Sequence, residues 1–321
     1  MFFRRETNVL NIGGVLIGGG NEIAVQSMTN TDTRDVQATV GQIRRLEEAG
    51  CHIVRVAVLD MEAAEAIAAI VREIQIPLVA DIHFDYRLAL QAIRSGAHKI
   101  RLNPGNIGDE DRVRAVVAAA KERNIPIRIG INGGSLEKSL LEKYGGVTPD
   151  AMVESAMYHV RLLEKHDFNN IVISIKSSNV PRMMAAYRLL SQQCDYPLHV
   201  GVTEAGTYRM GLIKSGMGIG GLLLDGIGDT IRVSLTDEPE KEVLAGLDIL
   251  RAAGHKVPGP EIISCPTCGR TNIPVANIAQ QVEEELRRRG FNRSIKIAVM
   301  GCVVNGPGEA READIGIAGG K

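Results

Sequence analysis

The chain has 321 residues and a formal net charge of -1, with 3% aromatic residues and no tryptophan. This near-neutral charge and the scarcity of aromatic rings argue against nucleic acid or a membrane surface as a partner. No apolar run of about 18 residues occurs, so no membrane-spanning helix is expected. The first ten residues lack the apolar stretch of an export signal. We therefore expect a cytoplasmic protein whose five cysteines are reduced, metal-bound or catalytic rather than disulfide-bonded.

Eight β-branched runs alternate with amphipathic helical segments over most of the chain. The runs occupy residues 22–29, 52–58, 76–83, 98–104, 125–132, 170–176, 196–203 and 230–236. Each is followed by a segment of helical period, such as residues 36–50 and 111–124. Eight strand-helix units in roughly 250 residues predict a (β/α)₈ barrel, with an open doubly wound sheet as the alternative. Residues 9–21 precede these units and predict a hairpin that plugs the lower end of the barrel.

A linker rich in proline and glycine, HKVPGP, follows the last predicted barrel helix at residues 255–260. We expect a barrel domain over residues 1–255 and a small α+β domain over residues 256–321. The small domain is predicted to contain a loop with CPTC, a helix over 273–290 and a strand over 295–301. A glycine-rich turn carrying Cys302 and a final strand over 314–319 complete it.

Five of the predicted barrel strands carry a cation, which is costly inside a parallel barrel unless the ion is paired. These cations are Arg55, Arg101, Arg128, Lys176 and Arg232. Helices cover the outer face of a barrel, so we expect these side chains to point into the lumen near the carboxyl ends of the strands. Asp81, Glu204 and Asp229 are expected to neutralise some of them, and the remaining positive charge predicts a ligand with two phosphoryl groups. Internal salt bridges, or strand-end side chains that reach solvent, are the alternative.

Further polar residues fall at or near the ends of these strands. Asn132 ends one strand, and Thr203 precedes Glu204 at the end of another. His83 follows Asp81 and is a candidate catalytic residue, whereas His199 is expected to be a core residue. The glycine-rich run SGMGIGG at residues 215–221 offers backbone N–H groups that bind phosphate in some proteins, although such a run is a weak signal alone.

Three cysteines lie in the predicted small domain: Cys265 and Cys268 in CPTC, and Cys302 in the later turn. They fit structural zinc, an iron-sulfur cluster or a redox dithiol with a third thiol nearby. Structural zinc normally has four nitrogen or sulfur ligands, so three thiols favour a catalytic cluster with an exchangeable fourth ligand. Glu309 in the same turn is a candidate because carboxylates exchange more readily than thiolates, and a solvated loop glutamate is the equal alternative. Cys51 and Cys194 are expected to be buried bystanders.

Seven motifs make the chain resemble the bacterial-type 4-hydroxy-3-methylbut-2-enyl diphosphate synthases of the methylerythritol phosphate route to isoprenoids. The motifs are VQSMTNTDT, ADIHFDYRLA, KIRLNPGNIG, IRIGINGGSLE, HVGVTEAG, CPTCGR and GCVVNGPGEA. They span nearly the whole chain, and the last two are highly specific at this spacing.

The resemblance implies a [4Fe-4S] cluster held by Cys265, Cys268, Cys302 and Glu309. It implies reductive ring opening and dehydration of 2-C-methyl-D-erythritol 2,4-cyclodiphosphate, with two electrons from a flavodoxin or ferredoxin. Glu204 matches the acid/base carboxylate of the family, and Asp81 and His83 match polar groups near it. The residues that match the family's substrate-binding positions are Arg55, Arg101, Arg128, Asn132, Lys176, Thr203, Arg232 and Ser234.

The predicted linker begins at the end of the barrel opposite the catalytic face, because the last helix runs back about 20 Å. Six linker residues span that distance only when nearly extended. We therefore expect a head-to-tail homodimer in which each cluster domain caps the partner's barrel. The rival hypotheses are a phosphate-binding barrel aldolase or synthase with a structural metal, and a metal-ribbon module for nucleic acid, which the neutral charge disfavours.

Overall fold

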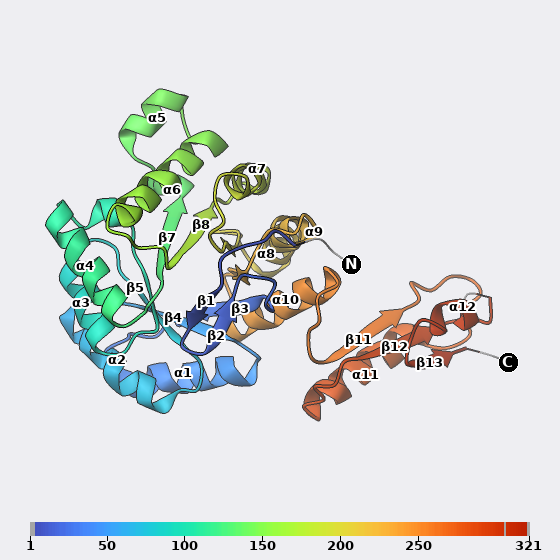
Figure 1. The fold of residues 1–321 in the computed structure, drawn as a ribbon. Helices are drawn as coiled ribbons and strands as arrows, with labels where there is room; N and C mark the ends of the chain where they lie inside the picture. The colour runs from blue at the N-terminus through green and yellow to red at the C-terminus, as the bar shows by residue number, and fades with distance from the viewer. Residues whose placement is uncertain (1–3, 305, 320–321) are drawn as a thin grey trace. The chain divides into compact units, whose positions relative to one another are not determined.

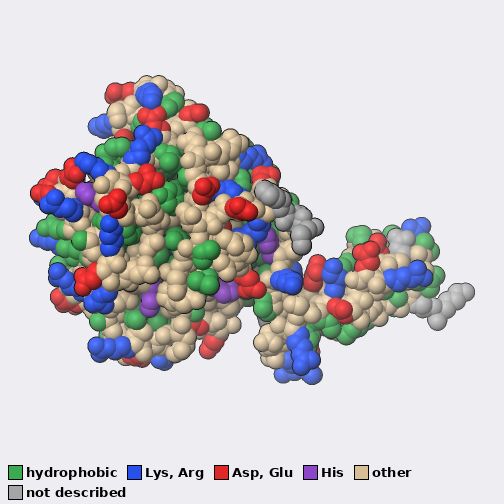
Figure 2. Space-filling model, viewed as in Figure 1, with side chains coloured by type: hydrophobic (Ala, Val, Ile, Leu, Met, Phe, Trp, Pro, Cys, Tyr) green, Lys and Arg blue, Asp and Glu red, His purple; other side chains and the backbone are tan. Residues whose placement is uncertain are grey.

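The computed structural model describes residues 4–304 and 306–319, and it divides the chain into two compact units between Ala253 and Gly254. Figure 1 shows the ribbon of both units. On the face drawn in Figure 2, acidic and basic side chains are intermixed over the described surface. Among the described residues, no helix combines the length and apolarity needed to cross a bilayer.

The first unit is built on eight parallel strands, which confirms the predicted (β/α)₈ barrel. The strands are β3 (Ala24–Met28), β4 (Ile53–Ala57), β5 (Leu78–Asp81), β6 (Lys99–Arg101), β7 (Ile127–Asn132), β8 (Ile171–Lys176), β9 (His199–Val200) and β10 (Thr230–Ile231). They pair in the order β8-β7-β6-β5-β4-β3-β10-β9. A parallel bridge between Ile173 and Leu198 joins β8 to the start of β9, so the two ends of the sheet meet.

Helices follow the strands along the chain, and in Figure 1 α1 to α4 lie around the outside of the sheet. The helices are α1 (Val36–Glu48), α2 (Met61–Glu73), α3 (Tyr86–Arg94), α4 (Glu110–Glu122), α5 (Lys138–Tyr144), α6 (Pro149–Glu164), α7 (Val180–Ser191), α8 (Tyr208–Ser215), α9 (Gly221–Leu224) and α10 (Pro239–Ala252). Aspartates start several of them: the side chains of Asp35, Asp60 and Asp109 each accept a backbone N–H of the first turn. This capping satisfies donors that a helix leaves open at its amino end.

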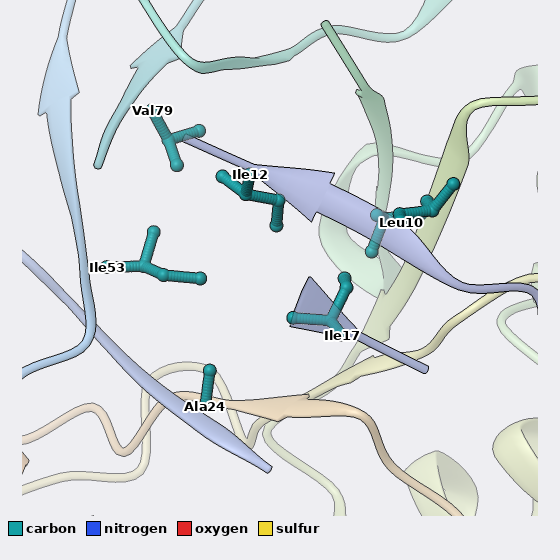
Figure 3. Close-up of a cluster of buried hydrophobic side chains, with 7 residues drawn as sticks. Leu10, Ile12, Ile17, Ala24, Ile53 and Val79 are labelled. Atoms are coloured by element: carbon teal, nitrogen blue, oxygen red, sulfur yellow. The ribbon is translucent and has the colours of Figure 1, made fainter. Parts of the chain in front are cut away.

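A hairpin of β1 (Leu10–Ile12) and β2 (Val15–Ile17) precedes the barrel. Leu10, Ile12 and Ile17 are buried in one apolar cluster with side chains near the amino ends of barrel strands, including Ile53 and Val79. Figure 3 shows these side chains converging. The hairpin therefore seals the lower end of the barrel, as the sequence predicted.

The glycine-rich run at residues 215–221 has a different role from the one expected. It continues α8 through a π-helical turn, Gly216–Gly220, into α9, so its backbone amides are engaged within the helix. A Cβ at Gly218 would come within 2.8 Å of Met183 and Val202 side-chain carbons. These glycines form a helix, and Gly218 lets that helix pack closely, so the possible phosphate-binding loop at residues 215–221 does not form.

The described residues of the second unit form a three-stranded parallel sheet with two helices. Its elements are β11 (Pro260–Ser264), α11 (Val275–Arg288), β12 (Ile295–Met300), α12 (Gly306–Ala310) and β13 (Ile315–Ala318), with β12 in the centre of the sheet. β11 was not predicted from the sequence, because a strand that begins with a proline resembles a continuation of the linker. Pro260 is the first residue of an edge strand, where proline is tolerated.

Candidate active site

A cavity of about 180 Å³ lies among residues at the carboxyl ends of the barrel strands. Its lining includes every residue predicted to bind substrate, together with Asp81 and His83. The lining residues are Arg55, Asp81, His83, Arg101, Arg128, Gly130, Ile131, Asn132, Ser174, Lys176, Thr203, Arg232 and Ser234. The fold thus gathers all five strand cations in one place.

Strand register explains why these side chains meet. Arg101 of β6 is paired with Arg128 of β7, and Asn132 of β7 with Lys176 of β8. Alternate residues of a strand face the same side, so each of these polar positions points into the lumen. Gly130 makes room: a Cβ there would lie 2.5 Å from Nε of Arg101, and Nη2 of Arg101 donates to the Gly130 carbonyl at 2.9 Å. Its signal in the sequence was a glycine inside a strand.

Asp81 is the acidic centre of the pocket. Its carboxylate lies 3.3 Å from Nη1 of Arg101, 3.9 Å from Nε of Arg55 and 3.6 Å from Nε2 of His83. Burial alone raises the pKa of Asp81, but the nearby Arg55, His83 and Arg101 outweigh it and hold that pKa well below its usual range. Asp81 is therefore an ionised group that orients two guanidinium groups and the imidazole.

Glu242 of α10 is a second carboxylate at the site, and it was not predicted from the sequence. Its Oε2 lies 3.5 Å from Nη2 of Arg232, and its Oε1 accepts the backbone N–H of Leu235 at 2.9 Å. The side chain is buried although it comes from an outer helix. An acidic residue in the first turn of a helix is usually read as a dipole partner, so the sequence carried no distinct signal of this contact.

Asp229 was expected to neutralise lumen cations, and this is wrong. Its carboxylate binds the N-terminal segment instead: Oδ1 lies 3.3 Å from Nη2 of Arg4 and accepts the Thr7 hydroxyl at 3.0 Å. Its Oδ2 accepts the backbone N–H of Leu198 at 2.8 Å. Asp229 precedes β10, so it lies at the amino end of the strand, away from the pocket.

Glu204, the candidate acid/base residue, is adjacent to the pocket without lining it. It follows Thr203, which lines the cavity, and its own side chain is exposed. Its backbone is left-handed, with φ of 50°. This conformation costs a non-glycine residue about 1 kcal/mol or more and is concentrated at functional sites.

Several guanidinium donors of the pocket have no strong acceptor. Nε and Nη2 of Arg55 point at the Met28 sulfur, at 3.1 and 2.9 Å, and a thioether is a weak acceptor. Among the described residues, Nε and Nη2 of Arg128 and Nε of Arg232 are buried without a hydrogen-bond partner. Burial lowers the pKa of Arg55 to about 10 despite the opposing effect of Asp81. The pocket therefore has an excess of buried donors and positive charge.

The three cysteines of the second unit lie on two loops at the carboxyl edge of its sheet. Cys265 directly follows β11 and donates its backbone N–H to Val299 of β12 at 3.0 Å. The backbone N–H of Cys268 donates to the Thr271 hydroxyl at 3.0 Å. Cys302 follows β12, and its carbonyl accepts the N–H of Gly306, the first residue of α12. Glu309 lies on that helix.

The donor set fits an iron-sulfur centre in chemistry and in topology, since three thiols and a carboxylate follow neighbouring strands at one edge. In the part of the chain that the structure describes, no three histidine, cysteine or acidic side chains are grouped closely enough to hold a metal ion. The thiol of Cys302 is buried and that of Cys268 is exposed. The ligand set thus stays a prediction.

Two family models match the chain: "GcpE TIM-barrel domain" over residues 7–247 and "GcpE protein C-terminal domain" over residues 261–321. A protein of Clostridium perfringens named "4-hydroxy-3-methylbut-2-en-1-yl diphosphate synthase (flavodoxin)" is 63% identical over 318 residues, covering 99% of this chain and 90% of the relative. A protein of Maridesulfovibrio salexigens with the same name is 61% identical over 321 residues, covering 100% and 89%.

Solved structures similar to this chain include dihydropteroate synthase of Yersinia pestis, with a TM-score of 0.53 and 13% identity, covering 77% of this chain and 97% of that chain. Type I 3-dehydroquinate dehydratase of Clostridium difficile matches with a TM-score of 0.53 and 12% identity, covering 75% and 98%. At this identity the likeness concerns the fold alone.

Proposed function

The chain belongs to the GcpE family, and from this premise we propose that it is a 4-hydroxy-3-methylbut-2-en-1-yl diphosphate synthase, an oxidoreductase of isoprenoid precursor biosynthesis. Its substrate in this proposal is 2-C-methyl-D-erythritol 2,4-cyclodiphosphate. The reaction opens the ring and removes one oxygen as water, and it consumes two electrons.

The observation that carries this proposal is the set of buried donors without strong acceptors. Arg55 faces a sulfur atom, and Arg128 and Arg232 retain buried N–H groups without partners among the described residues. Two phosphoryl groups supply both the negative charge and the several acceptor oxygens that these guanidinium groups need. A neutral substrate would leave the same groups buried and unpaired, which is costly.

Cys265, Cys268, Cys302 and Glu309 would hold the [4Fe-4S] cluster, which supplies the two electrons when bound. The other steps rest on side chains of the barrel. Arg55, Arg101, Arg128, Lys176 and Arg232 bind and orient the diphosphate, with Asn132, Thr203 and Ser234 at the cavity wall. Their excess of positive charge also stabilises the negative charge that develops as the ring opens.

Loss of an oxygen as water requires a proton donor near the reacting carbon. Asp81 is unsuited, because its low pKa keeps it ionised. Glu204 is adjacent to Thr203 at the cavity and is the proposed acid/base residue, with His83 held beside Asp81 as the second candidate. A displacement of the Glu204 side chain towards the cavity is needed for this role.

The relatives' name specifies flavodoxin, and we propose a flavodoxin or ferredoxin as electron donor for this chain. We also propose a head-to-tail homodimer, in which the cluster unit of one protomer caps the barrel of the other. Apolar side chains in loops after barrel strands support a covered mouth: Leu59 and Phe84 are 76% and 74% exposed. The cytoplasm, where thiols stay reduced, is the proposed location.

The test is the content of iron and acid-labile sulfide in anaerobically purified protein, followed by an assay with the cyclodiphosphate and reduced flavodoxin. We expect about four iron and four sulfide per chain, as a cubane cluster requires, and product formation that depends on the reductant. Stoichiometric zinc without sulfide would overturn the reductive reaction and leave a phosphate-binding barrel aldolase or synthase with a structural metal.

A further inference from the structure

Lys99 is a completely buried lysine inside the barrel that neither the cavity lining nor the proposed reaction uses. It lies on β6 two residues before Arg101, so both side chains face the lumen. Its strand partner is Val79, which belongs to the apolar cluster above the hairpin. Lys99 therefore occupies the layer between the apolar plug and the cationic pocket.

The surroundings of Lys99 are short of acceptors. Nζ makes one hydrogen bond, to Oε1 of Gln26 at 3.5 Å, and none of the ion pairs found among the described residues includes it. In the described part of the chain, Nε2 of Gln26 and Nε2 of His199 are also buried without a hydrogen-bond partner. Nδ1 of His199 pairs with the Thr230 hydroxyl at 2.8 Å.

Most of the charged side chains that share the barrel lumen with Lys99 are cations. The charged or titratable groups that share the lumen are Arg55 of β4, Asp81 of β5, Arg101 of β6, Arg128 of β7, Lys176 of β8, His199 of β9 and Arg232, which directly follows β10. β3 contributes the neutral Gln26, and the hairpin below contributes apolar side chains. Glu242 is already paired with Arg232.

An ammonium ion in this position would be buried, nearly unpaired and surrounded by other cations. Burial, with Arg128 and Arg55 nearby, holds the pKa of Lys99 well below its usual range. Guanidinium groups keep their protons far more strongly than amines do. The two buried amines of the lumen, Lys99 and Lys176, are therefore the groups that lose a proton most readily in the ligand-free barrel, and Lys99 is the one outside the cavity lining.

We propose that Lys99 is neutral in the ligand-free barrel and takes up one proton from water when a diphosphate occupies the pocket above it. No bond of the ligand breaks: the proton moves from solvent to Nζ, and the new ammonium lies beneath two phosphoryl groups. Lys99 is thus a positioning residue that adds positive charge only when anionic charge is present. The identity of the natural ligand rests on the proposed function, whereas the proton uptake requires only a diphosphate.

The experiment is isothermal titration calorimetry of the full-length, anaerobically purified protein near pH 8, in buffers of different ionisation enthalpy. Wild type, Lys99→Met and the control Lys121→Met, which alters an exposed lysine of α4, are each titrated with the cyclodiphosphate and with inorganic pyrophosphate. We expect Lys99→Met to take up about one proton fewer than wild type and to bind at least roughly tenfold more weakly. Lys121→Met should match wild type.

Two further readouts separate this role from a purely structural one. In wild type the affinity for pyrophosphate should fall by up to about tenfold per pH unit as pH rises between the free and bound pKa values, and Lys99→Met should lack this slope. Ligand-free Lys99→Met should melt no lower than wild type at pH 7, since it buries no amine that has to lose a proton.

Equal proton uptake in wild type and Lys99→Met would overturn the inference and assign the proton to Lys176 or His199. Binding of pyrophosphate with the expected uptake, but none of the cyclodiphosphate, would support the role of Lys99 and contradict the proposed substrate. If neither compound bound to wild type, both proposals would fall.

Discussion

The barrel unit carries its candidate functional groups on strands of a packed sheet, whereas the C-terminal unit carries its cysteines on loops. In the barrel, Arg55, Arg101 and Arg128 lie on strands of one hydrogen-bonded sheet, and Asp81 orients the first two of them. In the C-terminal unit, Cys265, Cys268 and Cys302 lie on loops, and no compact ligand group forms among the described residues. A diphosphate site can be preorganised by a packed fold, whereas a cluster site is completed by the cluster it holds.

The hydrophobic cores of the two units also differ: the barrel core is extensive, whereas that of the C-terminal unit is small. The barrel has a closed sheet covered by helices and sealed below by the hairpin. Among the described residues of the C-terminal unit, four of the seven buried hydrophobic side chains come from one strand, β12: Ile297, Ala298, Val299 and Met300. A unit of this size usually needs a metal, a disulfide or a partner for stability. We therefore expect the C-terminal unit to depend on its cluster for stability, and the barrel to fold without it.

The largest expected effect is that of Cys268→Ser, which tests the separation of the two units. The side chain is exposed, so the change removes a thiol with little effect on packing. We expect the variant to lose its iron. Its activity should fall by more than the roughly 10–100-fold that is typical when a residue beside a metal ligand is changed. Melting of the C-terminal unit should occur at a lower temperature. Pyrophosphate binding should remain.

Iron analysis, activity assays, thermal melts and titration calorimetry measure these four outcomes, with Cys194→Ala in the barrel as the control that keeps its iron. Loss of diphosphate binding in Cys268→Ser would contradict the independence of the barrel site.

Arg128→Met is the converse test, because it changes the barrel site and leaves the C-terminal unit unaltered. The substitution keeps much of the side-chain volume and removes a buried charge that has one hydrogen bond, to the Ser174 hydroxyl at 3.0 Å. Diphosphate affinity should fall by about 2–5 kcal/mol, because a buried ionic contact with the ligand is lost. Iron content should stay unchanged, and the barrel should melt no lower, since an unpaired buried cation is removed. Calorimetry and thermal melts give the result.

The matched control for this variant is Arg114→Met, an exposed arginine of α4 paired with Asp111 of the same helix. An equal loss of affinity in both variants would mean that Arg128 has no specific role in the pocket.

Glu309→Ala sharpens the contrast within the C-terminal unit, because it removes the predicted non-thiol ligand and leaves three cysteines. We expect iron to be largely retained and turnover to fall about 10–100-fold, the range for a change that perturbs a metal centre without dismantling it. Steady-state kinetics on protein of known iron content would show this. Unchanged turnover with an intact cluster would remove Glu309 from the ligand set.

The smallest effect concerns acid stability of the barrel. The folded pKa of Asp81 is depressed, so its ion pairs contribute stability above the unfolded value of about 3.9 and lose it as pH falls below that value. Asp81→Asn should destabilise the barrel at pH 7 by about 1–3 kcal/mol, because buried donors lose their charged acceptor. The variant's melting temperature should also fall less than that of wild type when the pH is lowered. Thermal melts between pH 7 and 3 would measure both. An identical acid shift in the variant would show that other carboxylates dominate.

The sequence by itself was sufficient to predict the barrel fold and most of the residues that line its pocket. The hydrophobic periodicity of a strand or helix depends only on neighbouring residues, so eight β/α units and their order could be predicted from residues 22–254. The cost of burying charge then identified Arg55, Arg128 and the other strand cations, because that cost depends only on an inward-facing strand position. The three thiols were recognisable from their spacing.

The tertiary structure decided which groups meet. Glu242 reaches Arg232 from an outer helix, whereas Asp229 binds the N-terminal segment; strand register and helix packing set these contacts over long sequence separations. The burial of Lys99 without a counterion could not be predicted from the sequence, because it depends on the side chains of all the surrounding strands. Local patterns specify the elements, and only their closure into a barrel specifies the partners of each charge.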